Sequence, residues 1–135
     1  MTPEYIAGFF DGEGCVSTFI HPRRNTRIAL SMTQKKPEVL HEIQRFLGYG
    51  KVYVDNRGTS HLRILGRQNA KDFIRLIYPR TIVKREELRL GYQLLGLVGS
   101  PGKRVSSGDR QRRLKLIEEI RGCKGSDRHT QSVKG

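Results

Sequence analysis

Cysteine and long apolar runs are both scarce in this sequence, and each scarcity excludes a class of protein. Only Cys15 and Cys123 occur among the 135 residues, so a disulfide framework is not expected. No stretch approaches the roughly 20 apolar residues that a membrane span needs. The N-terminus has neither the basic region nor the apolar run of a signal peptide. We therefore expect an intracellular protein of the cytoplasm, nucleoid or organelle matrix, neither secreted nor bound in a membrane.

Acidic side chains are also few. Asp and Glu number 13 against 26 Lys and Arg, which gives a formal net charge of +13 and a pI near 10.4. The basic residues are spread along the chain, which favours a basic face on a folded domain over a basic tail. An excess of this size indicates a polyanionic partner, either nucleic acid or an anionic membrane surface. A basic surface that is merely solvated is the alternative.

Hydrophobic periodicity predicts one α+β domain with a C-terminal appendage. Helical spacing indicates helices over about 3–12, 37–48, 70–78 and 83–97, and strand alternation indicates two hairpins over about 15–33 and 51–65. The resulting order, αββαββα with an antiparallel four-stranded sheet, occupies residues 1–100. Residues 101–121 are expected to hold a linker and a short helix, and 122–135 a flexible polar tail. The positions expected to be buried are Val16, Thr18, Ile20, Ile28, Leu30, Met32, Val39, Leu40, Ile43, Phe46, Leu47, Val52, Val54, Leu62, Ile64, Ala70, Phe73, Ile74, Ile77, Leu114, Ile117 and Ile120.

The other side of the predicted strands is basic and polar, with few acids. Antiparallel sheets often leave one face wet, so a purely solvated face is the alternative to a nucleic-acid surface. Strand ribbons can enter the DNA major groove and read base edges, while loop cations contact phosphates. Exposed aromatic side chains suited to RNA stacking are few, which favours duplex DNA. The candidate DNA-binding residues are Ser17, Phe19, His21, Arg23, Arg24, Asn25, Arg27, Ala29, Ser31, Lys51, Tyr53, Asp55, Arg57, His61 and Arg63.

The segment YIAGFFDGEGCV, residues 5–16, combines glycines, aromatic residues and acids. Gly8 and Gly12 share one helix face, where each glycine costs about 0.5–1 kcal/mol relative to alanine. Close packing of two such helices across an interface would compensate for this cost; ordinary close packing within the monomer is the alternative. In a symmetric pair of helices the two Glu13 carboxylates would lie together and repel. A hard divalent cation such as Mg²⁺ would resolve that repulsion.

The stretch IAGFFDGEG resembles the signature motif of the LAGLIDADG homing endonucleases over nine consecutive positions. Ala7, Gly8, Asp11 and Gly14 are identical to the letters of the motif, and Glu13 replaces its second Asp with another carboxylate. The order αββαββα across residues 3–97 also fits this family. The resemblance implies a site-specific endonuclease that makes a metal-dependent double-strand break, with short 3′ overhangs, in a long, near-palindromic DNA site.

A single copy of the motif makes the chain similar to the homodimeric members of that family, whose two sheets form a saddle over duplex DNA. The resemblance implies Mg²⁺ or Mn²⁺ for cleavage, with Ca²⁺ supporting binding alone. Glu13 matches the metal-binding acid, and the Gly12 carbonyl matches a further metal contact. The motif helix would form the dimer interface. Its implied interface residues are Ile6, Ala7, Gly8, Phe9, Asp11 and Gly12.

Three further residues take their expected roles from the resemblance. Gln34 in MTQKK matches a glutamine that orders solvent in the active site, and Lys84 in PRTIVKREE matches a lysine near the scissile phosphate. Asp11 is expected to make a local cap or hydrogen bond. Glu38 departs from the basic residue of some relatives, a position for which Lys35 or Lys36 would substitute.

Other functions on the same fold are open alternatives. They are an RNA maturase that assists intron splicing and a catalytically inactive DNA-binding regulator. A basic RNA-binding component of a ribonucleoprotein is a third. Retention of Glu13, Gln34 and Lys84 together favours an active nuclease, because a protein that only binds has no need of that set.

Overall fold

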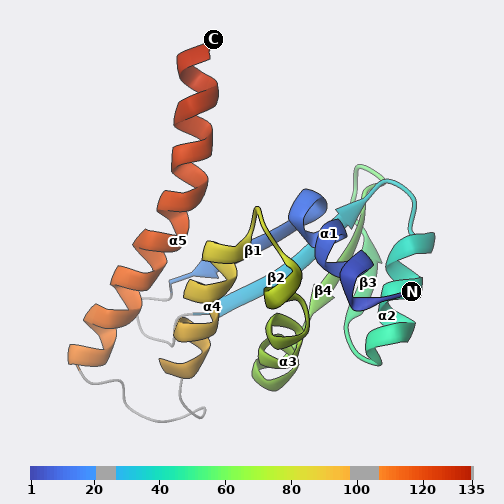
Figure 1. Ribbon diagram of the computed structural model, residues 1–135, viewed down its shortest axis with the longest axis horizontal. Coiled ribbons are helices and arrows are strands. Elements are labelled where there is room, and N and C mark those ends of the chain that lie inside the picture. Colours follow the sequence, from blue (N-terminus) through green and yellow to red (C-terminus); the bar gives the residue numbers. More distant parts are fainter. Residues whose placement is uncertain (21–26, 98–106, 135) are drawn as a thin grey trace.

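The computed structural model describes residues 1–20, 27–97 and 107–134, with side chains in the last helix described over 108–124. Its elements follow the predicted order αββαββα and then add two helices (Figure 1). They are α1 (Pro3–Glu13), β1 (Gly14–Phe19), β2 (Arg27–Gln34), α2 (Glu38–Leu47), β3 (Lys51–Val54), β4 (Ser60–Ile64), α3 (Arg67–Ile77), a 3₁₀ turn η1 (Tyr78–Arg80), α4 (Arg85–Leu97) and α5 (Ser107–Lys134).

Four antiparallel strands form one sheet in the order β1-β2-β4-β3. The two predicted hairpins are therefore joined through β2 and β4, and β1 and β3 lie at the edges. Helices α1 to α4 cover one face of this sheet (Figure 1). The buried apolar strand residues on that face are Val16, Leu30, Met32, Leu62 and Ile64, and Ser60 of β4 is buried beside them. The alternation of apolar and polar residues thus separates a core face from a polar face, as predicted.

Helix α1 begins and ends at residues suited to those positions. The side chain of Thr2 accepts a hydrogen bond from the backbone N–H of Tyr5 at 3.1 Å, and Pro3 occupies the first turn. At the other end the helix passes into β1 without a loop. A Cβ atom on Gly14 would lie 2.4 Å from the ring of Phe10, so only glycine fits this junction. This junction holds Glu13 at the start of the sheet.

Most of the predicted core is confirmed, and the exceptions lie at strand ends and on the outer sides of helices. Ala70, Phe73, Ile74 and Ile77 are all buried on α3. By contrast, Val54 is 60% exposed, because it ends the edge strand β3. The predictions of burial were also wrong for Ile20, which follows the last residue of β1, and for Phe46 on α2.

Helix α5 is longer than the short helix that was expected, because it continues through the proposed polar tail to Lys134. Leu116, Ile117 and Ile120 are buried against the core, whereas Leu114 is 38% exposed. The prediction for Leu114 was therefore wrong, since Leu116 supplies the buried contact. None of the helices over the described residues is both long and apolar enough to cross a membrane.

Candidate active site and nucleic-acid interface

The strand register places the predicted side chains of the strands together on the sheet face opposite the helices. We call this the polar face. Its cross-strand rows are Phe19 with Arg27, Ser17 with Ala29, Cys15 with Ser31, Arg63 and Lys51, and Thr33 with His61 and Tyr53. Cys15 and Thr33 were absent from the predicted set, although strict alternation along their strands places them on this face.

Positive charge on the polar face is supplied by arginine and lysine. Arg27 and Lys51 are exposed, and Arg63 is half-buried between them in the sheet. The Nε of Arg63 is buried and has no hydrogen-bond partner among the described residues. Arg63 therefore adds positive charge between the two hairpins without a neutralising hydrogen-bond partner at its Nε among the described residues.

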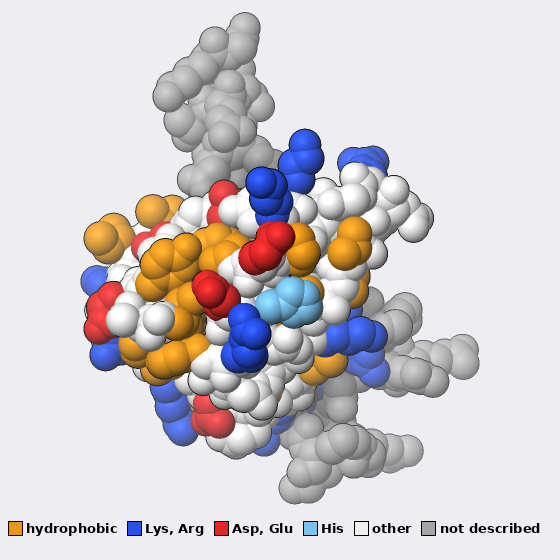
Figure 2. Space-filling model, turned by 90° about the vertical axis from the view of Figure 1, so that its right-hand side faces the viewer, with side chains coloured by type: hydrophobic (Ala, Val, Ile, Leu, Met, Phe, Trp, Pro, Cys, Tyr) orange, Lys and Arg blue, Asp and Glu red, His pale blue; other side chains and the backbone are white. Residues whose placement is uncertain are grey.

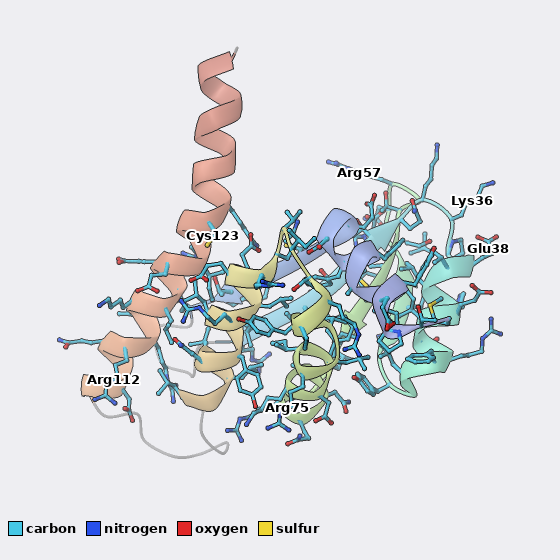
Figure 3. The ribbon with its side chains drawn as sticks, viewed as in Figure 1. Lys36, Glu38, Arg57, Arg75, Arg112 and Cys123 are labelled. Carbon is cyan, nitrogen blue, oxygen red and sulfur yellow. The ribbon has the colours of Figure 1, made fainter. Side chains whose placement is uncertain are left out.

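Asp55 lies in the turn after β3 and not in the strand, which corrects its predicted placement, and Arg57 lies in the turn as predicted. The Oδ1 atom of Asp55 accepts hydrogen bonds from the backbone N–H groups of Arg57 at 2.8 Å and Thr59 at 3.0 Å. Asp55 therefore organises the turn, as short acidic side chains often do. Figure 3 shows Arg57 projecting from this turn away from the body of the molecule.

The turn between β1 and β2 was predicted to supply further contacts. His21, Arg23, Arg24 and Asn25 lie outside the described residues. Their roles stay predictions.

Glu13 ends α1 with an exposed side chain, next to the exposed backbone of Gly12. Carbonyl groups at the C-terminus of a helix carry partial negative charge and attract cations. The carboxylate and these carbonyls are hard oxygen donors, the type that Mg²⁺ takes. Within the described ranges, no three His, Cys, Asp or Glu side chains gather as a metal-binding cluster. The donor chemistry therefore fits a divalent cation, but one chain supplies too few ligands to enclose it.

Asp11 has a structural role, as predicted, but its contacts are not local. Its carboxylate accepts hydrogen bonds from the backbone N–H groups of Ile82 at 2.8 Å and Lys84 at 3.0 Å. The Lys84 side chain then donates from Nζ to the backbone carbonyl of Asp11 at 3.3 Å. These bonds connect positions 71 to 73 residues apart and bring Lys84 to the end of the helix that carries Glu13.

Gln34 lies at the same end of the sheet. Gly14 pairs with Met32, so Gln34, two residues further along β2, reaches about 7 Å beyond the start of β1. Its side-chain oxygen accepts a hydrogen bond from the N–H of Lys35 at 3.0 Å. Glu38 is the first residue of α2, where the helix dipole favours an acid. The structure therefore gathers Glu13, Lys84 and Gln34 at one end of the sheet.

The surroundings of Gly8 and Gly12 on the outer side of α1 bear on the explanation of these glycines by packing within the monomer. A Cβ atom added to Gly8 or Gly12 would meet nothing within 4 Å, so packing within the monomer does not require glycine there. Ile6 and Ala7 are fully buried in the core of their own chain. Their assignment to a dimer interface was wrong, because this side of the helix faces inward. The carboxylate of Asp11 is also committed within the chain.

Exposed apolar side chains lie close to these glycines. Tyr5 is 52% exposed and stacks on Phe9 with ring centroids 6.4 Å apart. Ile82, whose N–H binds Asp11, is 81% exposed, and Val83 follows it with 69% exposure. Figure 2 views the molecule from the right-hand side of Figure 1, where α2 lies. Hydrophobic side chains gather in the left half of this view, with charged side chains around them. An apolar helix surface without side chains at two positions is suited to contact with another surface.

Two basic side chains of α5 contact the edge strand β1. The periodicity of apolar residues in α5 did not predict these contacts. Arg121 donates to the hydroxyl and the carbonyl of Thr18, both at 3.3 Å. Lys124 donates to the carbonyl of Val16 and lies 3.2 Å from the sulfur of Cys15. Figure 3 shows Cys123, the neighbour of Lys124, on the part of α5 that lies near the body of the molecule.

Comparison with known proteins gives concordant matches. Residues 3–78 match a family model described as a LAGLIDADG-like domain. The DNA endonuclease I-CvuI of Chlorella vulgaris is 27% identical over 99 residues, which cover 67% of this chain and 62% of the relative. The chain thus spans less than two thirds of the length of this curated relative.

Solved structures share the fold. The archaeal intron-encoded homing endonuclease I-Vdi141I complexed with DNA has a TM-score of 0.79 at 23% identity, covering 90% of this chain and 82% of that one. I-CvuI in complex with its target in the presence of 2 mM Ca has a TM-score of 0.75 at 23% identity, covering 90% and 80%. At these identities, the similarity establishes a common fold.

Proposed function

The chain belongs to the family of LAGLIDADG-like domains, and from that premise we propose that it is a site-specific DNA endonuclease of the homing type. The observation that carries the proposal is the convergence of Glu13 and Lys84 at the end of α1, where the polar face begins. A protein that only binds nucleic acid does not require a carboxylate and a lysine at this point. The relative I-CvuI, named as a DNA endonuclease, supports the same reading.

Duplex DNA would bind on the polar face. Arg27, Lys51 and Arg57 supply exposed positive charge for phosphates, while the rows between them offer polar atoms to base edges. The half-buried Arg63 adds a further cation on the same face. The net charge of +13 would make the affinity fall steeply with salt.

The active protein would be a homodimer whose two α1 helices meet at Gly8 and Gly12. The open space at both glycines supports this arrangement, because it allows two helix backbones to approach closely. Exposed Tyr5, Ile82 and Val83 would be covered at the same time. Two sheets would then present one extended surface to a near-palindromic site.

Glu13 from both subunits, with the Gly12 carbonyls, would hold the divalent cation. The resemblance points to Mg²⁺ or Mn²⁺ for cleavage and Ca²⁺ for binding alone. When bound, the cation supplies Lewis-acid stabilisation of the phosphate and lowers the pKa of a bound water. Lys84 holds positive charge where negative charge develops on the phosphate, and its contact with the Asp11 carbonyl keeps it there. Gln34 would orient solvent at the same end of the sheet.

The test uses a duplex in which the DNA flanks of this reading frame are joined without interruption. With Mg²⁺, we expect a double-strand break at the junction. Glu13→Gln should retain binding within about twofold in Ca²⁺ but lose cleavage by about 100-fold or more, because it removes the negative charge that holds the cation.

Glu42→Gln, which changes an exposed carboxylate on α2, is the matched control and should cleave normally. Unimpaired cleavage by Glu13→Gln would contradict the assignment of the active site. Tight binding of the junction without a break in the unmodified protein would instead support a DNA-binding regulator or a maturase.

A further inference from the structure

His61 stands at the centre of a small ordered group on the polar face. Its Nε2 lies 2.8 Å from Oδ2 of Asp55, and its ring stacks on Tyr53 with centroids 4.9 Å apart and planes 14° from parallel. The side chain of His61 is 20% exposed and that of Asp55 34%. A histidine ring held at one nitrogen and along one face has a fixed position in the surface that DNA would meet.

The chemistry of Asp55 determines which ring nitrogen of His61 carries the hydrogen. The hydrogen bond with His61, followed by that from the backbone of Thr59, lowers the pKa of the Asp55 carboxyl. An ionised carboxylate only accepts hydrogen bonds, so Nε2 of His61 must be the donor. In the neutral ring Nδ1 is then an acceptor. Among the described residues, Nδ1 has no hydrogen-bond partner.

We propose that Asp55 is a positioning residue for base recognition, which holds His61 as the Nε2–H tautomer with Nδ1 as the acceptor toward DNA. This inference rests on the proposed function. An acceptor in the major groove pairs with an exocyclic amino group, which adenine and cytosine present there and guanine and thymine do not. His61 therefore favours adenine or cytosine at one position of each half-site, and Tyr53 holds the plane of the ring.

The two carboxylate oxygens of Asp55 have different hydrogen-bond partners. Asp55→Asn is therefore expected to change one of these contacts and to keep the others. Oδ1 accepts the backbone N–H groups of Arg57 and Thr59, and asparagine keeps an oxygen for that purpose. Oδ2 faces His61, and an amide nitrogen there would donate to Nε2. The hydrogen of the ring would then move to Nδ1. Asp55→Asn is thus expected to keep the turn and to convert His61 from an acceptor to a donor toward DNA.

The tautomer is measurable in the free protein by long-range ¹H–¹⁵N NMR of the histidine rings at about pH 8.5, where an ordinary imidazole is neutral. His61→Gln assigns the signal. We expect the Nε2–H pattern in the unmodified protein and the Nδ1–H pattern in Asp55→Asn. An Nδ1–H ring in the unmodified protein, a ring still doubly protonated at this pH, or no change in Asp55→Asn would overturn the inference.

Base preference is measured by selection from a random duplex library in Ca²⁺. In Asp55→Asn, the preference for cytosine, which presents no acceptor in the major groove, should fall by about five- to tenfold relative to guanine and thymine at one position of each half-site. Other positions should keep their preferences. Asp72→Asn on α3, which changes an exposed carboxylate away from the sheet, is the matched control.

A double-mutant cycle separates positioning from any direct contact made by Asp55. In a His61→Ala background, Asp55→Asn should leave the profile unchanged, and an equal change there would overturn the positioning role. If the unmodified protein shows a base preference at each half-site that Asp55→Asn does not alter, the role of Asp55 is overturned and the proposed function is not. Selection of no duplex by the unmodified protein would overturn the proposed function and, with it, base reading by His61.

Discussion

Asp11 and Glu13 are two acids on one helix, and their surroundings give them different tasks. Both oxygens of Asp11 accept backbone hydrogen bonds from the segment that leads into α4. Glu13 is exposed at the end of the helix. Because Asp11 orders residues 82–84, it also determines where Lys84 stands. The acid that does not take part in the chemistry therefore positions the lysine that is proposed to do so.

We predict that Asp11→Ala lowers the free energy of unfolding by about 1–3 kcal/mol, because it leaves the N–H groups of Ile82 and Lys84 without their acceptor. Urea unfolding at neutral pH measures the effect. Asp72→Ala, an exposed carboxylate on α3, should change the value by less than about 0.5 kcal/mol. Equal stability of the two variants would show that the Asp11 contacts do not hold this segment.

At the scale of elements, α5 protects an edge of the sheet. Edge strands expose unpaired backbone groups that invite pairing with other chains, and proteins often cover them. Here Arg121 and Lys124 bind carbonyl groups of β1, and Ile117 and Ile120 pack on the core. The described part of the C-terminal appendage is therefore packed as part of the fold, although its sequence carries no feature of the family motif.

Ile120→Ala is predicted to destabilise the protein by about 2–4 kcal/mol, because it truncates a fully buried side chain through which α5 packs on the core. Leu114→Ala on the same helix should cost less than about 1 kcal/mol, since Leu114 is partly exposed. Thermal unfolding of the two variants provides the comparison. A similar loss in both would mean that α5 is not seated on the core through Ile120.

At the scale of the whole molecule, two surfaces have chemistry that is suited to different kinds of partner. The polar face presents basic side chains suited to a polyanion, whereas the outer side of α1 presents glycine and apolar residues. The two surfaces meet at Glu13, which ends α1 and precedes β1. A second copy on the apolar side would therefore bring two Glu13 residues to the centre of a continuous DNA surface.

Gly8→Arg is predicted to leave the monomer folded and to abolish the dimer and cleavage. Nothing in the chain lies within 4 Å of a Cβ at Gly8, so the fold accepts the change, whereas two helices in contact would not. Gly96→Arg on α4, where a Cβ also meets nothing within 4 Å, is the control and should dimerise. Sedimentation gives the mass and circular dichroism the fold. A Gly8→Arg protein that remained dimeric would exclude α1 as the interface.

The class and order of the elements, the polar stripe of the strands and the family motif could all be predicted from the amino-acid sequence alone. These features depend on periods of two or 3.6 residues and on contiguous residues, which are local properties. The alternation around Ser17, Ser31 and Arg63, for example, predicts the face on which the strand register places them.

Which apolar residues are buried follows from the packing of the elements against one another, because burial depends on what covers an element. Val54 and Leu114 fit their local patterns yet are exposed, and Leu116 is buried instead. The tertiary structure also turned Ile6 inward and joined Asp11 to Lys84 across 73 residues. No periodicity in the chain encodes these contacts. They arise where α1 packs beside the segment before α4, and that packing sets the geometry of the candidate active site.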